Sequence, residues 1–378
     1  MKAFKKGEGK LIIKEELFVQ KEVVEETIAR LVENLTTIND DSGEFLLDFN
    51  GLKVDDKSWS VWNWPQGVGL YGIYKNYQLT KNPRAAEVVK EWFEARMQEG
   101  APPKNVNTMA PILTMAYLYE ETGDTRYLPY LQQWAEWVMN DMPRTEEDGL
   151  QHATYGPENK NQLWDDTLMM TVLPLAKIGK LLDRPEYLEE ARYQFMIHIK
   201  YLMDKRTGLW YHGWTFEGNH NYAEAFWGRG NCWLTIAIPE IIAILELKEG
   251  DAFRKLLIET LEAQVQTLAK YQSESGLWHT LIDDPTSYLE SSATAGFAYG
   301  ILKAVHERYL PKKYLEIAYR AIQGLLEQVD ETGEVQNVSV GTGMGDDLEF
   351  YRTIGKTAMP YGQSLLVLCL TELLVSYC

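Results

Sequence analysis

Two adjacent carboxylates, Asp165 and Asp166, are the residues of this chain best suited to acid–base chemistry. They follow Trp164 and precede an almost wholly apolar segment that begins LMM. Carboxylates at a helix N-terminus are favoured by the helix dipole, so a capping pair on a solvated end is one interpretation. We favour the other, in which one carboxylate lies in a partly desolvated pocket, because burial raises a carboxyl pKa toward the range an acid catalyst needs.

Aromatic and amide side chains recur near such positions. Trp62 and Trp64 alternate in WNWPQG, and an indole can stack on the apolar C–H face of a sugar ring. Packing of both tryptophans in the core is an equally good interpretation. Asn105 and Asn107 precede another apolar segment, where one of them is expected to cap a helix while the other points inward.

Three histidines, His152, His212 and His279, stand at similar positions after glycine-centred phrases. A histidine among aromatic residues on such a loop suits a hydrogen bond to a substrate, although each can equally be a structural loop residue. Three imidazoles that converge would bind zinc. We expect symmetric repeat positions to lie far apart, and therefore predict no metal.

Arg229 stands in FWGRGNCW, between Trp227 and Trp233. A guanidinium group at that position is suited to hold a carboxylate in a bidentate pair. The alternative is an internal salt bridge. That alternative is serious because the chain has 37 Lys and Arg against 55 Asp and Glu, a net charge of −18.

The elements that must position these residues repeat along the chain. A glycine-centred phrase recurs at Gly43, Gly100, Gly149, Gly208, Gly276 and Gly333. Between the phrases, apolar spacing predicts amphipathic helices near 22–36, 85–97, 126–140, 186–204, 252–271 and 311–328. Helices that are apolar on most sides, and therefore buried, are predicted near 65–79, 107–121, 164–182, 228–247, 291–308 and 359–376.

Six amphipathic helices that alternate with six buried ones predict an all-α fold, the (α/α)6 barrel. An open helical solenoid is the alternative, but its repeat is usually shorter and steadier. We predict one catalytic domain over 1–378, with 1–20 as an N-terminal extension.

Composition excludes several classes of function. The acidic balance argues against a nucleic-acid or membrane partner, and no apolar run approaches the length of a membrane span. The N-terminal segment has no long apolar core, so we expect no signal peptide. Cys232, Cys369 and Cys378 suggest no disulfide framework, which favours a cytoplasmic location. Phosphate-loop, G-x-S-x-G and H-E-x-x-H motifs are absent.

From about Trp62 to its end, the chain resembles the unsaturated rhamnogalacturonyl hydrolases, glycoside hydrolase family 105, relatives of the unsaturated glucuronyl hydrolases of family 88. The phrases that carry the resemblance are WNWPQGVGLYG, NVNTMAPILTMAYLYEETGD, QLWDDTLMM, TGLWYHGW, FWGRGNCW, ESGLWH, ESSA and SVGTGMG. The resemblance implies an (α/α)6 barrel and removal of a 4,5-unsaturated uronic acid from the non-reducing end of an oligosaccharide. It also implies that no metal or organic cofactor is required.

The same resemblance implies roles for individual residues. Asp166 is the expected catalyst: it donates a proton to C4 of the vinyl ether and activates the water that adds at C5. The expected substrate-binding residues are Trp62, Trp64, Asn107, His152, Trp164, His212, Trp227, Arg229 and Trp233. Asn107 stands where related families often carry a second Asp, which leaves the proton chemistry to Asp166. Galacturonyl specificity is inherited from the resemblance alone.

Two other functions remain open from the sequence. A hydrolase of saturated sugars on the same barrel would use two separated carboxylates, Asp166 with Glu290 or Asp346. A non-catalytic helical scaffold or sugar-binding protein would present an extended groove rather than a closed pocket. The leading expectation is an enzyme whose partner is a small unsaturated oligosaccharide, such as the unsaturated rhamnogalacturonan disaccharide.

Overall fold

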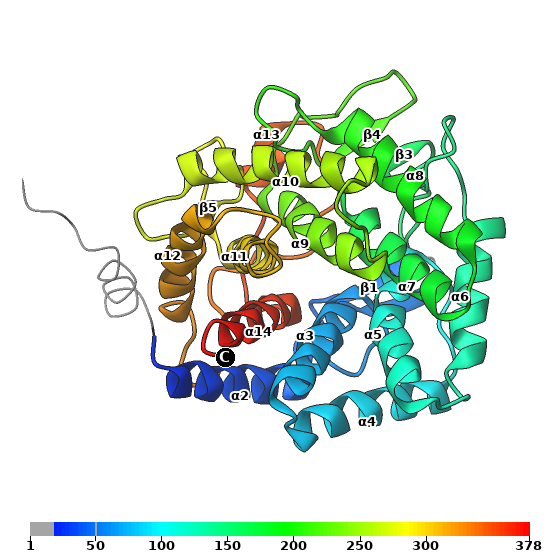
Figure 1. The fold of residues 1–378 in the computed structure, drawn as a ribbon, viewed down its shortest axis with the longest axis horizontal. Helices are drawn as coiled ribbons and strands as arrows, with labels where there is room; N and C mark the ends of the chain where they lie inside the picture. The colour runs from blue at the N-terminus through cyan, green and yellow to red at the C-terminus, as the bar shows by residue number, and fades with distance from the viewer. Residues whose placement is uncertain (1–18, 50) are drawn as a thin grey trace, which may run out of the picture.

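Two sets of helices alternate along the chain in the computed structural model, which describes residues 19–49 and 51–378 (Figure 1). The predicted extension 1–20 lies almost entirely outside the described residues. The outer helices are α2 (Lys21–Thr37), α4 (Pro83–Glu99), α6 (Leu128–Asn140), α8 (Pro185–Leu202), α10 (Ala252–Tyr271) and α12 (Leu315–Leu326). The inner helices are α3 (Trp64–Thr80), α5 (Val106–Thr122), α7 (Leu173–Leu181), α9 (Gly228–Ile244), α11 (Ser291–His306) and α14 (Pro360–Val375). Both predicted sets are confirmed, except that the third inner helix begins later than predicted.

The inner helices form a closed ring. Each packs against the next in chain order, and the last, α14, packs against the first, α3 (Figure 1). An open solenoid would leave these two helices apart. The protein is therefore an (α/α)6 barrel.

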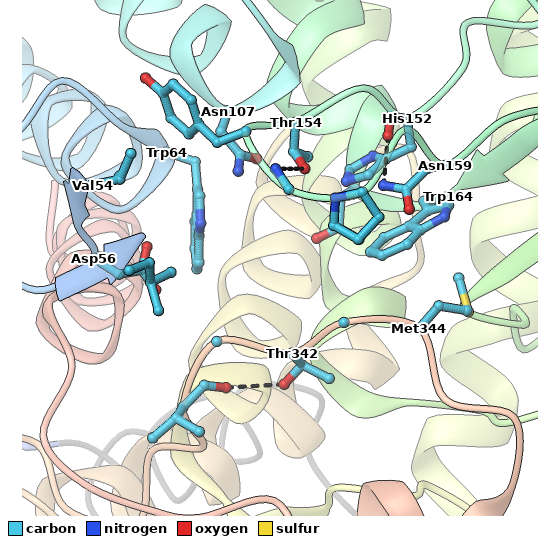
Figure 2. Close-up of a pocket in the computed structure, with 18 of the residues that line it drawn as sticks. Val54, Asp56, Trp64, Asn107, His152, Thr154, Asn159, Trp164, Thr342 and Met344 are labelled. Atoms are coloured by element: carbon cyan, nitrogen blue, oxygen red, sulfur yellow. Dashed lines mark hydrogen bonds between the residues drawn. The ribbon is translucent and has the colours of Figure 1, made fainter. Parts of the chain in front are cut away.

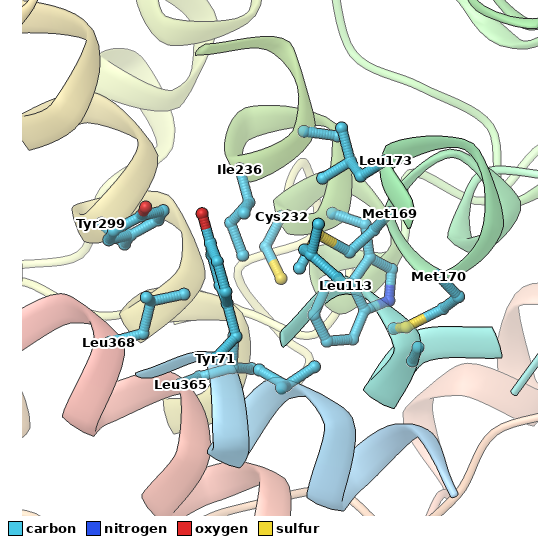
Figure 3. Packing of buried hydrophobic residues seen from close by; sticks show 14 of the residues in the cluster. Tyr71, Leu113, Met169, Met170, Leu173, Cys232, Ile236, Tyr299, Leu365 and Leu368 are labelled. Atoms are coloured by element: carbon cyan, nitrogen blue, oxygen red, sulfur yellow. The ribbon is translucent and has the colours of Figure 1, made fainter. Parts of the chain in front are cut away.

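The ring is filled with apolar side chains. Tyr71 from α3, Leu113 from α5, Ile236 from α9 and Tyr299 from α11 all reach its centre (Figure 3). An inner helix has neighbours in the ring and an outer helix behind it, so nearly every side of it is buried, as its sequence pattern indicates. No helix in the described part of the chain has the length and hydropathy needed to cross a membrane.

Short elements occupy the connections. Three antiparallel pairs are β1 (Leu46–Phe49) with β2 (Leu52–Asp55), β3 (Gln162–Trp164) with β4 (Gly213–Thr215), and β5 (Trp278–His279) with β6 (Leu289–Glu290). The described residues also form a π-helical turn at Leu168–Val172, a 3₁₀ turn at Lys312–Tyr314 and the short helix α13 (Leu348–Arg352).

The third inner helix differs from its prediction. The pattern predicts one helix over 164–182, but Trp164 ends strand β3 and the helical backbone begins with the π turn. In that turn the Leu173 N–H donates to the Leu168 carbonyl, five residues back. Pro174 follows directly and has no N–H to donate, so the regular pattern of helical hydrogen bonds is interrupted at this point.

Candidate active site

A cavity of about 820 Å³ opens at the N-terminal ends of the inner helices (Figure 2). Hairpin β1–β2, the first turn of α5 and the segments around the starts of α3, α7, α9 and α14 supply its wall. Seven residues of the predicted site line it: Trp64, Asn107, His152, Trp164, Asp166, Trp227 and Arg229. The structure therefore brings together most of the residues that the sequence singled out.

The pairing of β3 with β4 builds the floor around Asp166. Trp164 pairs with Gly213, and the Asp165 N–H donates to the His212 carbonyl at 3.2 Å. This pairing places Nε2 of His212 3.7 Å from Oδ2 of Asp166. His212 lies behind the cavity wall and does not line it, so its predicted contact with substrate is replaced by a contact with Asp166.

The two histidines of this region lie on either side of one tryptophan. The His152 ring stacks on Trp164 with centroids 4.2 Å apart, and the His212 ring meets the same indole edge-on at 5.0 Å. The expectation that repeat-related histidines lie far apart is wrong for this pair, because the β3–β4 pairing joins their loops. His279 does lie elsewhere, with Nδ1 against the Ser287 carbonyl.

Buried polar atoms without partners gather at the floor. Both carboxylate oxygens of Asp165, Oδ2 of Asp166 and Nε2 of His212 have no hydrogen-bond partner among the described residues. Asp165 is 0% exposed and lies against Gly230, where an added Cβ would come within 2.3 Å of its Oδ2. Asp165 is thus a buried acid and not the helix cap that its position suggested. Buried groups are almost always paired, so such a cluster indicates a functional site.

Burial sets the protonation of this cluster. It raises the pKa of Asp165 well above its ordinary value, and the charge of Asp166 acts in the same direction. Burial lowers the pKa of His152 to about 4 and also lowers the pKa of His212. Burial alone would raise the pKa of Asp166. The hydrogen-bonding contact with His212, together with the charge interactions with His212 and His152, outweighs burial and brings the pKa to about 2. Of the two neighbouring carboxyl groups, Asp166 therefore ionises first and Asp165 holds its proton more strongly.

The same three groups have the spacing of metal ligands. Asp165, Asp166 and His212 offer ligand atoms within 4.8 Å of one another. A metal ion binds the ionised carboxylate, however, and the raised pKa of Asp165 disfavours that form. The cluster is better suited to proton transfer than to metal binding.

Two predicted tryptophans do not line the cavity. The Trp62 indole packs between the outer and inner layers, stacked on Trp134 at 5.7 Å, and its Nε1 donates to the Thr108 carbonyl. Trp233 is fully buried behind the wall, edge-on to Trp64 at 5.6 Å. The chain turns into α3 at Trp64, so the alternating tryptophans separate into one core residue and one cavity residue. Their predicted roles in substrate contact are therefore corrected.

The two asparagines divide as predicted. Asn105 caps α5, since its Oδ1 accepts from the Asn107 and Thr108 N–H groups at 2.9 and 3.0 Å. Asn107 lines the cavity (Figure 2).

The guanidinium group of Arg229 donates hydrogen bonds to a loop of the protein itself. Its Nη1 donates to Ser339, and its Nη2 donates to the Val340 carbonyl and Thr342 Oγ1 at 3.0 and 3.1 Å. Glu290 lies 3.9 Å from Nη1. These donors hold the glycine-rich loop 339–345, whose residues 340–344 line the cavity. Arg229 thus positions this loop while it also lines the cavity, and its contact with a substrate carboxylate stays a prediction.

Sequence reasoning missed the opposite wall. Asp56 lines the cavity beside Trp64 at the end of the β1–β2 hairpin, and loop 340–344 faces it (Figure 2). The adjacent acids of LKVDD, shortly before the tryptophan-rich phrase, were a signal that could have found Asp56. The facing loop belongs to the SVGTGMG phrase, whose only signal in the sequence is the family resemblance.

Comparison with known proteins identifies the family. Residues 37–377 match the model of Glycosyl Hydrolase Family 88. The chain belongs to this family. It is thus a glycoside hydrolase, and the fold and enzyme class inferred from the sequence are confirmed.

Relatives and solved structures agree with the family assignment. The unsaturated rhamnogalacturonyl hydrolase YesR of Bacillus subtilis is 33% identical over 317 residues, 83% of this chain and 90% of YesR. Crystal structures of possible GH105 members from Salmonella enterica and Klebsiella pneumoniae are each 54% identical, cover all of both chains and superpose with a TM-score of 0.96. A family 105 glycoside hydrolase of C. acetobutylicum shares the fold at 23% identity, with a TM-score of 0.76 over 93% of this chain and 98% of that one.

Proposed function

We propose that this family 88 enzyme removes a 4,5-unsaturated uronic acid from the non-reducing end of short, lyase-generated oligosaccharides derived from pectin. The observation that carries the proposal is the unpaired cluster of Asp165, Asp166 and His212 beneath an aromatic cavity. The likeness to YesR supports galacturonyl substrates such as the unsaturated rhamnogalacturonan disaccharide.

In the proposed reaction, Asp166 gives its proton to C4 of the vinyl ether and leaves positive charge at C5 and the ring oxygen. The Asp166 carboxylate then takes a proton from a water molecule whose oxygen bonds to C5. The resulting hemiketal collapses, which opens the ring and releases the aglycone. One carboxyl group acts first as acid and then as base.

Asp166 must be protonated for the first step, whereas it is charged in the free protein. A bound uronate adds negative charge and excludes water, and both effects raise the pKa of a neighbouring carboxyl group. Asp165, whose raised pKa favours its protonated form, lies directly beside it. Substrate binding therefore prepares the acid form of Asp166.

The two alternative functions find less support. Glu290 is 1% exposed and accepts from the Ala293 and Ser339 N–H groups at 2.6 and 3.0 Å, and Asp346 is exposed. Neither lines the cavity, so neither forms the carboxylate pair that a hydrolase of saturated sugars would need. The site is a cavity rather than the extended groove expected of a scaffold.

The test is an assay of the purified protein with lyase-generated fragments of several polyuronides. We expect loss of the ultraviolet absorbance of the unsaturated uronate, fastest with the rhamnogalacturonan disaccharide. Release of saturated sugars from ordinary glycosides, with every unsaturated fragment left intact, would contradict the proposal.

We also propose a cytoplasmic location. All three cysteines are free, and reducing compartments favour free thiols. Fractionation of the producing cells tests this, and activity found mainly outside the cytoplasm would contradict it.

A further inference from the structure

The proposed substrate is an anion, yet the fixed charges of the cavity do not favour one. Among the described lining residues, Asp56, Asp166 and Arg229 are the only Asp, Glu, Lys or Arg side chains. The guanidinium of Arg229 already binds loop 339–345, and Glu290 lies 3.9 Å away. With Asp56 ionised, the wall would carry two carboxylates against one partly neutralised cation.

Asp56 is placed to meet whatever occupies the cavity. It directly follows strand β2 and stands beside Trp64, across the cavity from Trp164 and His152 (Figure 2). Its Oδ1 accepts from Asn63 Nδ2 at 3.2 Å. A Cβ on Gly341 would lie 2.9 Å from its Oδ2, so the loop that Arg229 holds packs directly on this carboxyl group.

The groups that face Asp56 do not hold it ionised. In the described part of the chain, no Lys or Arg nitrogen comes within 4.0 Å of its carboxyl group. Burial raises the pKa of Asp56 to about 7. The positive charge of Arg229 on α9 opposes this rise, and the negative charge of Asp55 on the same hairpin adds to it. Tyr361 on α14 also faces it, and burial keeps the pKa of that phenol high and its hydroxyl neutral.

We propose that Asp56 is a specificity-determining residue, whose protonated carboxyl group donates a hydrogen bond to the carboxylate of the bound sugar and whose ionised form repels that sugar. This inference rests on the proposed function. A hydrogen bond from a carboxyl group to a carboxylate is charge-assisted and therefore strong. Two ionised carboxylates within hydrogen-bonding distance of each other repel. The pH then governs KM through Asp56, while kcat depends on the cluster around Asp166.

The first experiment compares three proteins with the unsaturated disaccharide between about pH 5.5 and pH 8.5. For the wild type, we expect KM to rise by up to roughly tenfold for each pH unit above the pKa of Asp56. Asp56→Asn keeps a hydrogen-bond donor but cannot ionise, so its KM should stay nearly flat while its kcat is retained. Glu44→Gln removes an exposed charge from the adjoining turn, outside the cavity, and should follow the wild type.

A second measurement needs no variant. The methyl ester of the substrate carries no negative charge, so its KM with the wild-type protein should not rise with pH. The inference is overturned if Asp56→Asn shows the wild-type rise, or if the ester shows the same rise as the acid. Loss of kcat in Asp56→Asn with KM unchanged would also overturn it, since Asp56 would then be a catalytic acid.

A separate binding experiment distinguishes failure of the proposed function from failure of the Asp56 proposal. If the wild type turns over no unsaturated uronide, calorimetry with a saturated uronyl disaccharide and its methyl ester tests Asp56 directly. Binding that weakens with pH for the acid alone supports the inference. Affinity that is independent of pH, or no binding at any pH, overturns it.

Discussion

Two buried acids in the barrel differ in what surrounds them. Glu240 is 1% exposed and accepts hydrogen bonds from Tyr71 at 2.7 Å and from Tyr299, with Lys303 at 3.9 Å. Asp165 is equally buried and lies against Gly230 of the same helix α9. Neither of its carboxylate oxygens has a hydrogen-bond partner in the described part of the chain. About 15 Å of helix separates the two positions.

The protonation of the two acids follows from their neighbours. Burial alone would raise the pKa of Glu240, but Lys303, Lys75 and the two tyrosines outweigh it and lower its pKa, so that Glu240 is charged. Among the described residues, no cation or tyrosine offsets burial at Asp165, and the charge of Asp166 adds to it, so the pKa of Asp165 is raised. A buried acid with partners holds the barrel together, whereas one without partners leaves a proton available beside the cavity.

The largest expected effect is on the cavity side. Asp166→Asn removes the proton that the reaction needs, and we expect kcat to fall by about 10³-fold. The circular dichroism spectrum and Tm should stay close to those of the wild type. Asp346→Asn, an exposed change outside the cavity, is the control and should keep its activity. Full activity in Asp166→Asn would remove this residue from the mechanism.

The matching change on the structural side is Glu240→Gln. It leaves Lys303 and Lys75 without their buried partner charge, so the free energy of unfolding should fall by about 3 kcal/mol. Denaturant titration measures this loss, and KM of the folded fraction should not change. Glu307→Gln removes the half-exposed partner of Lys303 and should have a much smaller effect. If Glu240→Gln raised KM and left the free energy of unfolding unchanged, Glu240 would not be the structural acid that the comparison with Asp165 makes it.

Trp64 and Trp62 also differ in this way, since the first lines the cavity and the second packs in the core. Trp64→Phe shrinks the cavity wall and should raise KM by about tenfold, since a smaller ring covers less of a sugar. Trp62→Phe removes the donor to the Thr108 carbonyl and should lower the unfolding free energy by about 1–2 kcal/mol with little change in KM. Kinetics and denaturant titration of both variants together test the assignment, and exchanged phenotypes would refute it.

The smallest expected effect concerns Asp165 and pH. Its pKa is raised in the folded protein and ordinary in the unfolded chain, so above its ordinary pKa of 3.8 the folded state binds more protons. The unfolding free energy contributed by this group therefore falls as pH rises. Asp165→Asn cannot ionise, so it should raise Tm relative to the wild type by a few degrees near pH 8 and by less near pH 5. A difference in Tm that is independent of pH would contradict the assigned protonation.

The pattern of neighbouring residues was sufficient to predict the barrel and much of the candidate site. The six inner helices are apolar on most sides, and a ring with an outer layer is a compact way to bury them all. Asn105 and Asn107 divided as predicted, because a helix N-terminus needs one capping acceptor, which leaves the neighbouring side chain free. Such inferences succeed where the deciding contacts lie within a few residues.

Pairings distant in the sequence decided the rest. His152 and His212 share the Trp164 ring because β3 pairs with β4, and no periodicity records that pairing. Arg229 binds residues more than a hundred positions away, so its role in holding loop 339–345 could not be inferred from FWGRGNCW.

The sequence by itself determined a closed helical barrel with a carboxylate and aromatic side chains at one end, since helical period and capping depend on neighbouring residues. Only the tertiary structure decided which acid keeps its proton, which tryptophan meets the cavity and that Asp56 faces it. Burial and the partners of a charged group come from segments that the chain brings together, and these two quantities set the pKa of a carboxyl group.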